Sequence, residues 1–318
     1  MTPSGDEPLD LYTTLGAVEL PRDVVQVSGP EAVAYLQGQL SQDVDALDVG
    51  AASWTFVLQP TGKVDVWGRV TRTGDAAFVL DVEAGAGEAL VARLRRFLLR
   101  TKAEVTLLDD WRCIVLRGPG AEEAAARADV RAEVRVPAGW PGVEGACLLG
   151  PDVTVPPGIP LASAADVEAT RITAGVPAMG SELTERTIPA EAGQWVIDAS
   201  VDFTKGCYTG QELVARIDSR GGNVPRRLRG LVLAEGSTPP VPGSRVRVGD
   251  DEVGEITSAA WSPALGASVA LAYVGRAVDP PAEGVAAEID GDAAGGSGPG
   301  DRVSAHIRQL PLVGSSVG

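Results

Sequence analysis

A chain of 318 residues with 44% hydrophobic residues can form two or three domains with buried cores, which excludes an intrinsically disordered protein. The net charge of −16, from 27 basic and 43 acidic residues, excludes nucleic-acid binding through the overall electrostatic field. No apolar run reaches the length of a membrane span, and the acidic N-terminus is unlike a signal peptide, so we expect a cytoplasmic protein.

Residues 15–110 are predicted to form a first α+β portion. The apolar pattern predicts, in chain order, a strand at 24–27, a helix after 28–31 with an apolar stripe as far as Val44, strands at 54–58, 64–70 and 77–82, and a helix around 90–98. A cap residue and a proline in the first turn mark the start of the first helix. The second helix carries arginines on its polar faces, as an amphipathic surface helix does.

Residues 111–225 are predicted to form a second α+β portion, and residues 226–318 a C-terminal β-barrel. The second portion has a strand at 113–116, a short alanine-rich helix near 122–128, further strands, helices at 166–174 and 209–217, and an irregular connector at 189–201. After residue 226, β-prone runs at 228–233, 245–248, 252–258, 269–273 and 303–307 alternate with Gly/Pro turns. The Gly-, Ala- and acid-rich stretch 279–301 is predicted to be a flexible insertion in this barrel.

Cysteine and histidine usage narrows the possible chemistry. Cys113, Cys147 and Cys207 lie far apart and form no pair with the spacing of a zinc or cluster-binding motif, which fits a reducing compartment. His306 is the one histidine of the chain, so Ser–His or Cys–His hydrolysis is not expected. Cys113 and Cys147 fall in apolar, strand-like runs and are predicted to be buried.

Residues 202–212 hold the highest density of functional residue types. Cys207 is predicted to lie in a loop just ahead of a helix, where free backbone N–H groups and the ammonium of Lys205 favour the thiolate. Gly206 and Gly210 indicate special dihedral angles or a close approach to a partner. From the residues alone, the alternative is that Cys207 is a small buried apolar side chain.

At residues 205–212, the run Lys-Gly-Cys-Tyr-Thr-Gly-Gln-Glu resembles the signature of the YgfZ/Iba57-type proteins. Further matching stretches lie at 35–44, 98–105, 171–177, 188–191 and 211–221, so the resemblance covers about residues 15–307. It implies an α+β fold like that of the glycine-cleavage T-protein, in which two α+β portions surround a central folate cavity and a β-barrel follows. It also implies a tetrahydrofolate-binding accessory factor for assembly or repair of 4Fe–4S proteins.

The same resemblance implies the site. Cys207 and Lys205 would carry the activity, and Gly206, Tyr208, Gly210, Gln211 and Glu212 would complete the motif. The predicted folate contacts are Arg171, Glu191 and Arg226, with Trp54, Trp67 and Trp195 as candidates either for pterin stacking or for core packing. The Cys207 thiolate could ligate a cluster iron, accept a sulfur or one-carbon unit, or form a mixed disulfide.

The implied partners are Fe–S enzymes or assembly proteins, including a radical tRNA-methylthiolating enzyme in bacteria, without direct contact to nucleic acid or membrane. The implied cofactor is a tetrahydrofolate, and no permanently bound metal is expected. Two alternatives remain, namely a scaffold with an inert Cys207 and a folate-dependent aminomethyltransferase or demethylase. The second alternative is disfavoured because Val66 and Trp67 stand near the positions of a T-protein Asp pair, with Asp65 out of register, and Thr173 replaces an acid.

Overall fold

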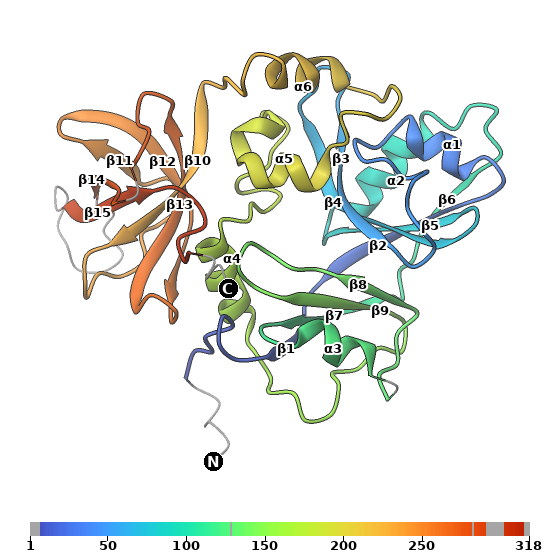
Figure 1. Ribbon diagram of the computed structural model, residues 1–318, viewed down its shortest axis with the longest axis horizontal. Coiled ribbons are helices and arrows are strands. Elements are labelled where there is room, and N and C mark those ends of the chain that lie inside the picture. Colours follow the sequence, from blue (N-terminus) through green and yellow to red (C-terminus); the bar gives the residue numbers. More distant parts are fainter. Residues whose placement is uncertain (1–6, 128, 282, 291–301, 315–318) are drawn as a thin grey trace.

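The computed structural model describes residues 7–127, 129–281, 283–290 and 302–314. Over these residues the chain forms a five-stranded sheet, a four-stranded sheet and a closed six-stranded barrel, with short helices packed on and between them (Figure 1). This architecture confirms the predicted fold class, two α+β portions followed by a C-terminal β-barrel.

The five-stranded sheet has the antiparallel order β3-β4-β5-β2-β6. Its strands are β2 (Arg22–Ser28), β3 (Ala52–Leu58), β4 (Val64–Gly74), β5 (Ala77–Glu83) and β6 (Glu104–Leu107). Apolar side chains of β2, β4 and β5 pack with helices α1 (Ala32–Gln37) and α2 (Gly87–Arg95) into one core. Helix α1 is shorter than predicted, yet Leu40 and Val44 are still buried in this core after it has ended, and α2 lies about three residues before its predicted range.

The four-stranded sheet has the order β1-β7-β9-β8 and combines distant parts of the chain. Its strands are β1 (Gly16–Glu19), β7 (Arg112–Arg117), β8 (Val134–Pro137) and β9 (Gly145–Gly150), with α3 (Ala121–Ala126) packed against it. Strand β1 falls in the predicted first portion but pairs with β7, so the division at residue 110 does not separate the two sheets. Helix α4 (Ala164–Ala174) starts at a capping box formed by Ser163 and Asp166 and contacts the barrel strand β12.

The prediction of an irregular connector at 189–201 is wrong. It forms a 3-10 turn, η1 (Pro189–Ala192), and a helix, α5 (Gln194–Ser200), which packs beside β3. Val196 and Ile197 of α5 join Phe56 and Trp67 of the first sheet in a second core. Seven residues make only two helical turns, too few for the apolar spacing to show a helical period.

The barrel has the order β10-β13-β12-β11-β14-β15 and closes through the pairing of β15 with β10. Its strands are β10 (Arg226–Leu233), β11 (Arg245–Val248), β12 (Asp251–Ser262), β13 (Ala267–Gly275), β14 (Val285–Asp290) and β15 (Arg302–Arg308). Strand β14 lies inside the stretch predicted as a flexible insertion and pairs with β11 and β15, so that prediction is wrong for 285–290. Residues 291–301 of the predicted insertion lie outside the described residues.

Candidate functional site

Cys207 lies in the loop 201–210, between the end of α5 and the start of α6 (Gln211–Asp218). Its side chain is exposed, whereas Cys113 and Cys147 are buried on β7 and β9. The predicted burial of the other two cysteines is therefore confirmed, and a buried apolar Cys207 is ruled out. In Figure 1 the loop and α6 lie along one side of the molecule, between the barrel and the first sheet.

Hydrogen bonds to the carboxylate of Asp202 hold the first turn of this loop. Its Oδ1 accepts hydrogen bonds from the backbone N–H of Thr204 at 2.6 Å, from the Thr204 hydroxyl at 2.7 Å and from the backbone N–H of Lys205 at 3.0 Å. These bonds lower the pKa of Asp202, and the bond from the Thr204 hydroxyl contributes most to that shift. Because the backbone N–H of Asp202 also donates to the carbonyl of Ser41, the turn is attached to the first α+β portion.

The ammonium of Lys205 points away from the loop and into the first portion. Its Nζ donates to the carbonyl oxygens of Gln37 at 2.8 Å, Leu40 at 2.7 Å and Gln42 at 2.9 Å. Burial lowers the pKa of Lys205 to about 8, and the negative charges of Asp43 and Asp202 oppose this shift in part. All three ammonium donors are occupied, so the prediction that Lys205 holds the Cys207 thiolate is wrong; Lys205 anchors the loop.

The remaining motif residues divide between packing and surface. Gly210 has φ +84°, and a Cβ there would lie 2.4 Å from the carbonyl oxygen of Gln59, so this glycine is required by the turn next to β3. Gly206 has open space where its Cβ would be, and nothing in the loop requires a glycine there. The side-chain oxygen of Gln211 accepts from the backbone N–H of Tyr208 at 3.1 Å, and Glu212 is exposed.

Substitution of Gly210 by alanine is expected to lower the free energy of unfolding by about 2 kcal/mol, because the new Cβ meets backbone in a left-handed conformation. Gly206→Ala is the matched control and is expected to change the free energy of unfolding by less than about 0.5 kcal/mol. Urea unfolding of both variants measures the difference. Equal stabilities would contradict the close packing of α6 against the β3–β4 turn.

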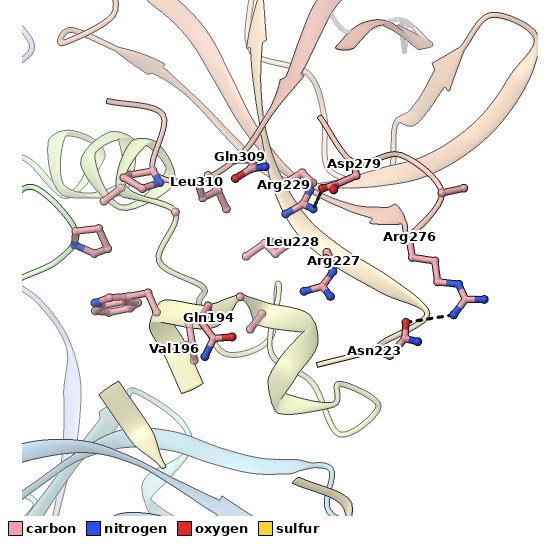
Figure 2. Close-up of a pocket in the computed structure, with 18 residues that line it drawn as sticks. Gln194, Val196, Asn223, Arg227, Leu228, Arg229, Arg276, Asp279, Gln309 and Leu310 are labelled. Atoms are coloured by element: carbon pink, nitrogen blue, oxygen red, sulfur yellow. Dashed lines mark hydrogen bonds and ion pairs between the residues drawn. The ribbon is translucent and has the colours of Figure 1, made fainter. Parts of the chain in front are cut away.

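A cavity of about 750 Å³ opens between α5, the start of β10 and the segments that follow β13 and β15. Figure 2 shows Gln194 and Val196 of α5 across from Arg227, Leu228 and Arg229 of β10, with Arg276, Asp279 and Gln309 around the opening. Arg229 donates to Asp279 at 3.0 Å, and Arg276 donates to the side chain of Asn223 at 3.3 Å (Figure 2). Apolar walls and several guanidinium groups suit an aromatic ligand with anionic groups.

Arg171, predicted as a folate contact, does not line this cavity. Its guanidinium donates to the carboxylates of Glu168 and Glu182, the carbonyl of Val176 and the hydroxyl of Ser258. Glu182 is fully buried, and its carboxylate also accepts from Ser258 at 2.6 Å. All donors of Arg171 are occupied in this junction between α4 and the barrel, which is a structural role in place of the predicted one.

Glu191 and Arg226 also lie beside the cavity and not in its lining. The Glu191 carboxylate is buried and accepts from the guanidinium of Arg226 at 3.2 Å, and that guanidinium lies 4.1 Å from the ring centre of Tyr273. At the start of β10, Arg227 and Arg229 line the cavity, while Arg226 is turned toward Glu191. The predicted contact Arg226 therefore lies outside the cavity lining, and Gln194, Asn223, Arg276 and Gln309, which come from separate segments, are lining residues that the sequence did not predict.

The three candidate tryptophans form one cluster. Trp54 and Trp67 stack with ring centres 4.2 Å apart, Trp67 donates to the hydroxyl of Ser200, and Trp195 meets both rings edge-on. Trp195 alone of the three lines the cavity. Asp65 lies away from this cluster, since its carboxylate pairs with Arg93 of α2 at 3.3 Å. Core packing therefore accounts for Trp54 and Trp67.

Among the described residues, no helix combines the length and the apolar character needed to cross a membrane.

Comparison with protein-family models finds two domains, which are separated by residues 137–225. The GCVT N-terminal domain matches residues 22–136, and the glycine cleavage T-protein C-terminal barrel domain matches residues 226–312. A solved aminomethyltransferase T of the glycine cleavage system from Bartonella henselae has a TM-score of 0.73 at 19% identity, covering 96% of this chain and 88% of that one. This similarity shows the fold.

Curated relatives carry two kinds of name. An Iba57 homolog of Neurospora crassa, named as a mitochondrial iron–sulfur cluster assembly factor, is 28% identical over 70% of this chain and 54% of its own length. An aminomethyltransferase of Streptomyces avermitilis is 28% identical over 90% of this chain and 85% of its own length. The chain thus spans about half the length of the Iba57 homologs and most of that aminomethyltransferase.

Proposed function

The chain belongs to the glycine-cleavage T-protein-like family, and from this premise we propose that it binds a tetrahydrofolate and supports assembly or repair of 4Fe–4S proteins through Cys207. The observation that carries the proposal is the exposed thiol on a loop held in place by buried contacts. The Iba57 homologs among the relatives support a role in Fe–S cluster assembly. All three cysteines are free, which supports a reducing compartment, and we propose the cytoplasm.

The cavity next to α5 fits the proposed cofactor. Folate has an aromatic pterin and an anionic glutamate tail, and the lining offers Trp195, apolar residues and the guanidinium groups of Arg227 and Arg229. The Nε of Arg229 is buried without a hydrogen-bond partner among the described residues, as expected where a ligand group supplies the acceptor. When bound, tetrahydrofolate supplies a nitrogen that can carry a one-carbon unit.

The Cys207 loop suits contact with another protein. Phe203, in the same loop, is 46% exposed and offers an apolar contact next to the thiol. One thiolate cannot hold a 4Fe–4S cluster, so we propose that a client or assembly protein supplies the other ligands. The cluster, or its iron or sulfur, is cargo in this scheme.

Loss of the thiol is expected to abolish this function without loss of the fold. In cells that lack the protein, we expect the wild type to restore 4Fe–4S enzyme activity, and tRNA methylthiolation where the organism has it. Cys207→Ser at matched expression should restore neither. Because Cys207 is exposed, the Tm of the Cys207→Ser protein should equal that of the wild type. Equal rescue by both proteins would leave only the scaffold alternative, in which the fold and its cavity suffice.

Folate binding has its own test. Arg227→Gln is expected to weaken binding of tetrahydrofolate about tenfold, because one charge-assisted hydrogen bond to the ligand is lost. Arg302→Gln, which removes the same charge from another part of the barrel, is the control and should leave the affinity unchanged. Calorimetric titration measures both. Unchanged affinity of Arg227→Gln would place the folate elsewhere.

The second candidate is a folate-dependent aminomethyltransferase or demethylase, favoured by the extent of the match to the Streptomyces avermitilis protein. Asp65, the acid nearest to the positions of the T-protein Asp pair, pairs with Arg93, and Trp67 packs in the aromatic cluster, which disfavours this reaction. Turnover of the glycine-cleavage intermediate, or of a methylated amine, with tetrahydrofolate would establish the second candidate instead.

A further inference from the structure

A second hollow adjoins the folate cavity on its outer side. It measures about 500 Å³ and is lined by Leu213, Arg216, Ile217, Arg220, Asn223 and Arg276. Asn223 and Arg276 line both hollows, so the two lie side by side. We define the arginine track as Arg229, Arg227, Arg276, Arg220 and Arg216, which leads from β10 in the cavity to the end of α6 (Figure 2 shows the first three).

Few acidic side chains neutralise the positive charge of the arginine track. Asp279, paired with Arg229, is the one acidic residue in the lining of the two hollows. Arg227 and Arg276 donate to neutral oxygens of Gly222 and Asn223, and Arg216 and Arg220 are exposed and make no ion pair among the described residues. In a chain with a net charge of −16, such a gathering of unneutralised guanidinium groups indicates a multiply charged anionic ligand.

We infer that the arginine track binds a chain of carboxylates continuous with the ligand in the cavity, namely the γ-linked glutamate extension of a folate. This inference rests on the proposed folate binding and names the form of folate that the protein selects. Arg216 lies in the last turn of α6 and Arg220 just beyond its end, and both line the second hollow. Arg227 and Arg229 are two residues apart on β10, roughly 6.6 Å. Extended glutamyl units place carboxylates at comparable separations.

The lining distinguishes this ligand from a nucleic acid. Leu213 and Ile217 supply aliphatic surface for the methylene groups of glutamyl units, and the second hollow has no aromatic side chain on which a base could stack. The track is also short, and outside it the acidic chain repels a long polyanion. An oligo-glutamate that starts in the cavity is short enough to contact the arginine track without reaching the acidic surface around it.

The test compares monoglutamyl and pentaglutamyl 5-formyltetrahydrofolate by calorimetry. We expect the wild type to bind the pentaglutamate at least about tenfold more tightly, with a difference that shrinks at high salt. The variant Arg216→Gln/Arg220→Gln should bind both ligands with the monoglutamate affinity of the wild type. Arg96→Gln/Arg100→Gln, which removes two exposed arginines with the same spacing elsewhere, should keep the full difference.

Each outcome separates the two proposals. Equal affinity of the wild type for both folates overturns the inference and leaves folate binding intact. If neither folate binds, the proposed cofactor is wrong and the inference that rests on it is overturned as well. Displacement of the pentaglutamate by a short RNA at equal charge would assign the track to nucleic acid and overturn the inference.

Discussion

Substitution of Asp81 by asparagine is expected to lower the free energy of unfolding by about 3–5 kcal/mol, because it leaves two guanidinium groups inside the protein without their counter-ion. The Asp81 carboxylate on β5 is fully buried and pairs with Arg69 of β4 at 2.5 Å and Arg22 of β2 at 2.8 Å. Arg69 is itself buried, and its Nη1 also donates to the sulfur of Cys147 at 3.1 Å, across the boundary between the two sheets.

The matched control is Glu19→Gln. Glu19 pairs with Arg112 at the same distance of 2.5 Å, but both side chains are nearly half exposed. Solvent-exposed pairs contribute about 0–1 kcal/mol, so urea unfolding should separate the two variants clearly. A similar small effect for both would mean that the Asp81 pair is hydrated in solution.

The same carboxylate should govern acid unfolding. Burial raises the pKa of Asp81, but the charges and hydrogen bonds of Arg69 and Arg22 outweigh burial, and the pKa lies below its ordinary value. The folded state therefore holds this proton less tightly than the unfolded chain. Its stabilisation is complete above the unfolded pKa of about 3.9 and is lost as the pH falls through the folded pKa. We expect Asp81→Asn to lack this part of the pH dependence of stability between about pH 5 and 2.

Lys205→Met is expected to release the Cys207 loop and to lower the free energy of unfolding by about 2–4 kcal/mol. Methionine keeps most of the aliphatic stem but removes the donors to the carbonyls of Gln37, Leu40 and Gln42, and hydrogen bonds to charged groups contribute more than neutral ones. Amide hydrogen exchange of 202–210 should accelerate, and alkylation of Cys207 should change in rate. These effects follow from anchoring and need no direct contact of Lys205 with the thiol.

Cys207→Ser is the control for this experiment, since an exposed thiol contributes little to stability and its loss should leave exchange in the loop unchanged. A Lys205→Met protein with wild-type stability and loop exchange but no rescue of 4Fe–4S enzymes would restore a chemical role for Lys205.

Strands of the barrel and of the two sheets were predictable where a β-prone apolar run is bounded by turn residues. The run 245–248 was predicted to the residue as β11, and β2, β3, β4 and β5 were all found within a few residues. Strand β14 escaped because its apolar residues, Val285, Ala287 and Ile289, are interleaved with acids and follow a Gly- and Pro-rich stretch. Its partners β11 and β15 decide its structure, and the local sequence does not.

The sequence by itself placed Cys207 in a loop just ahead of an amphipathic helix, as the structure confirms, but from the residues alone the exposure of its thiol stayed open. Only the tertiary structure decided what the neighbouring charges do. The ammonium of Lys205, the guanidinium of Arg171 and that of Arg226 all find buried acceptors on segments distant in sequence. Folding brings carbonyl and carboxylate oxygens together from distant segments, and a long charged side chain turns toward those oxygens because a buried charge needs partners. Along β10, a step of one residue separates Arg226, which contacts Glu191, from Arg227, which lines the cavity.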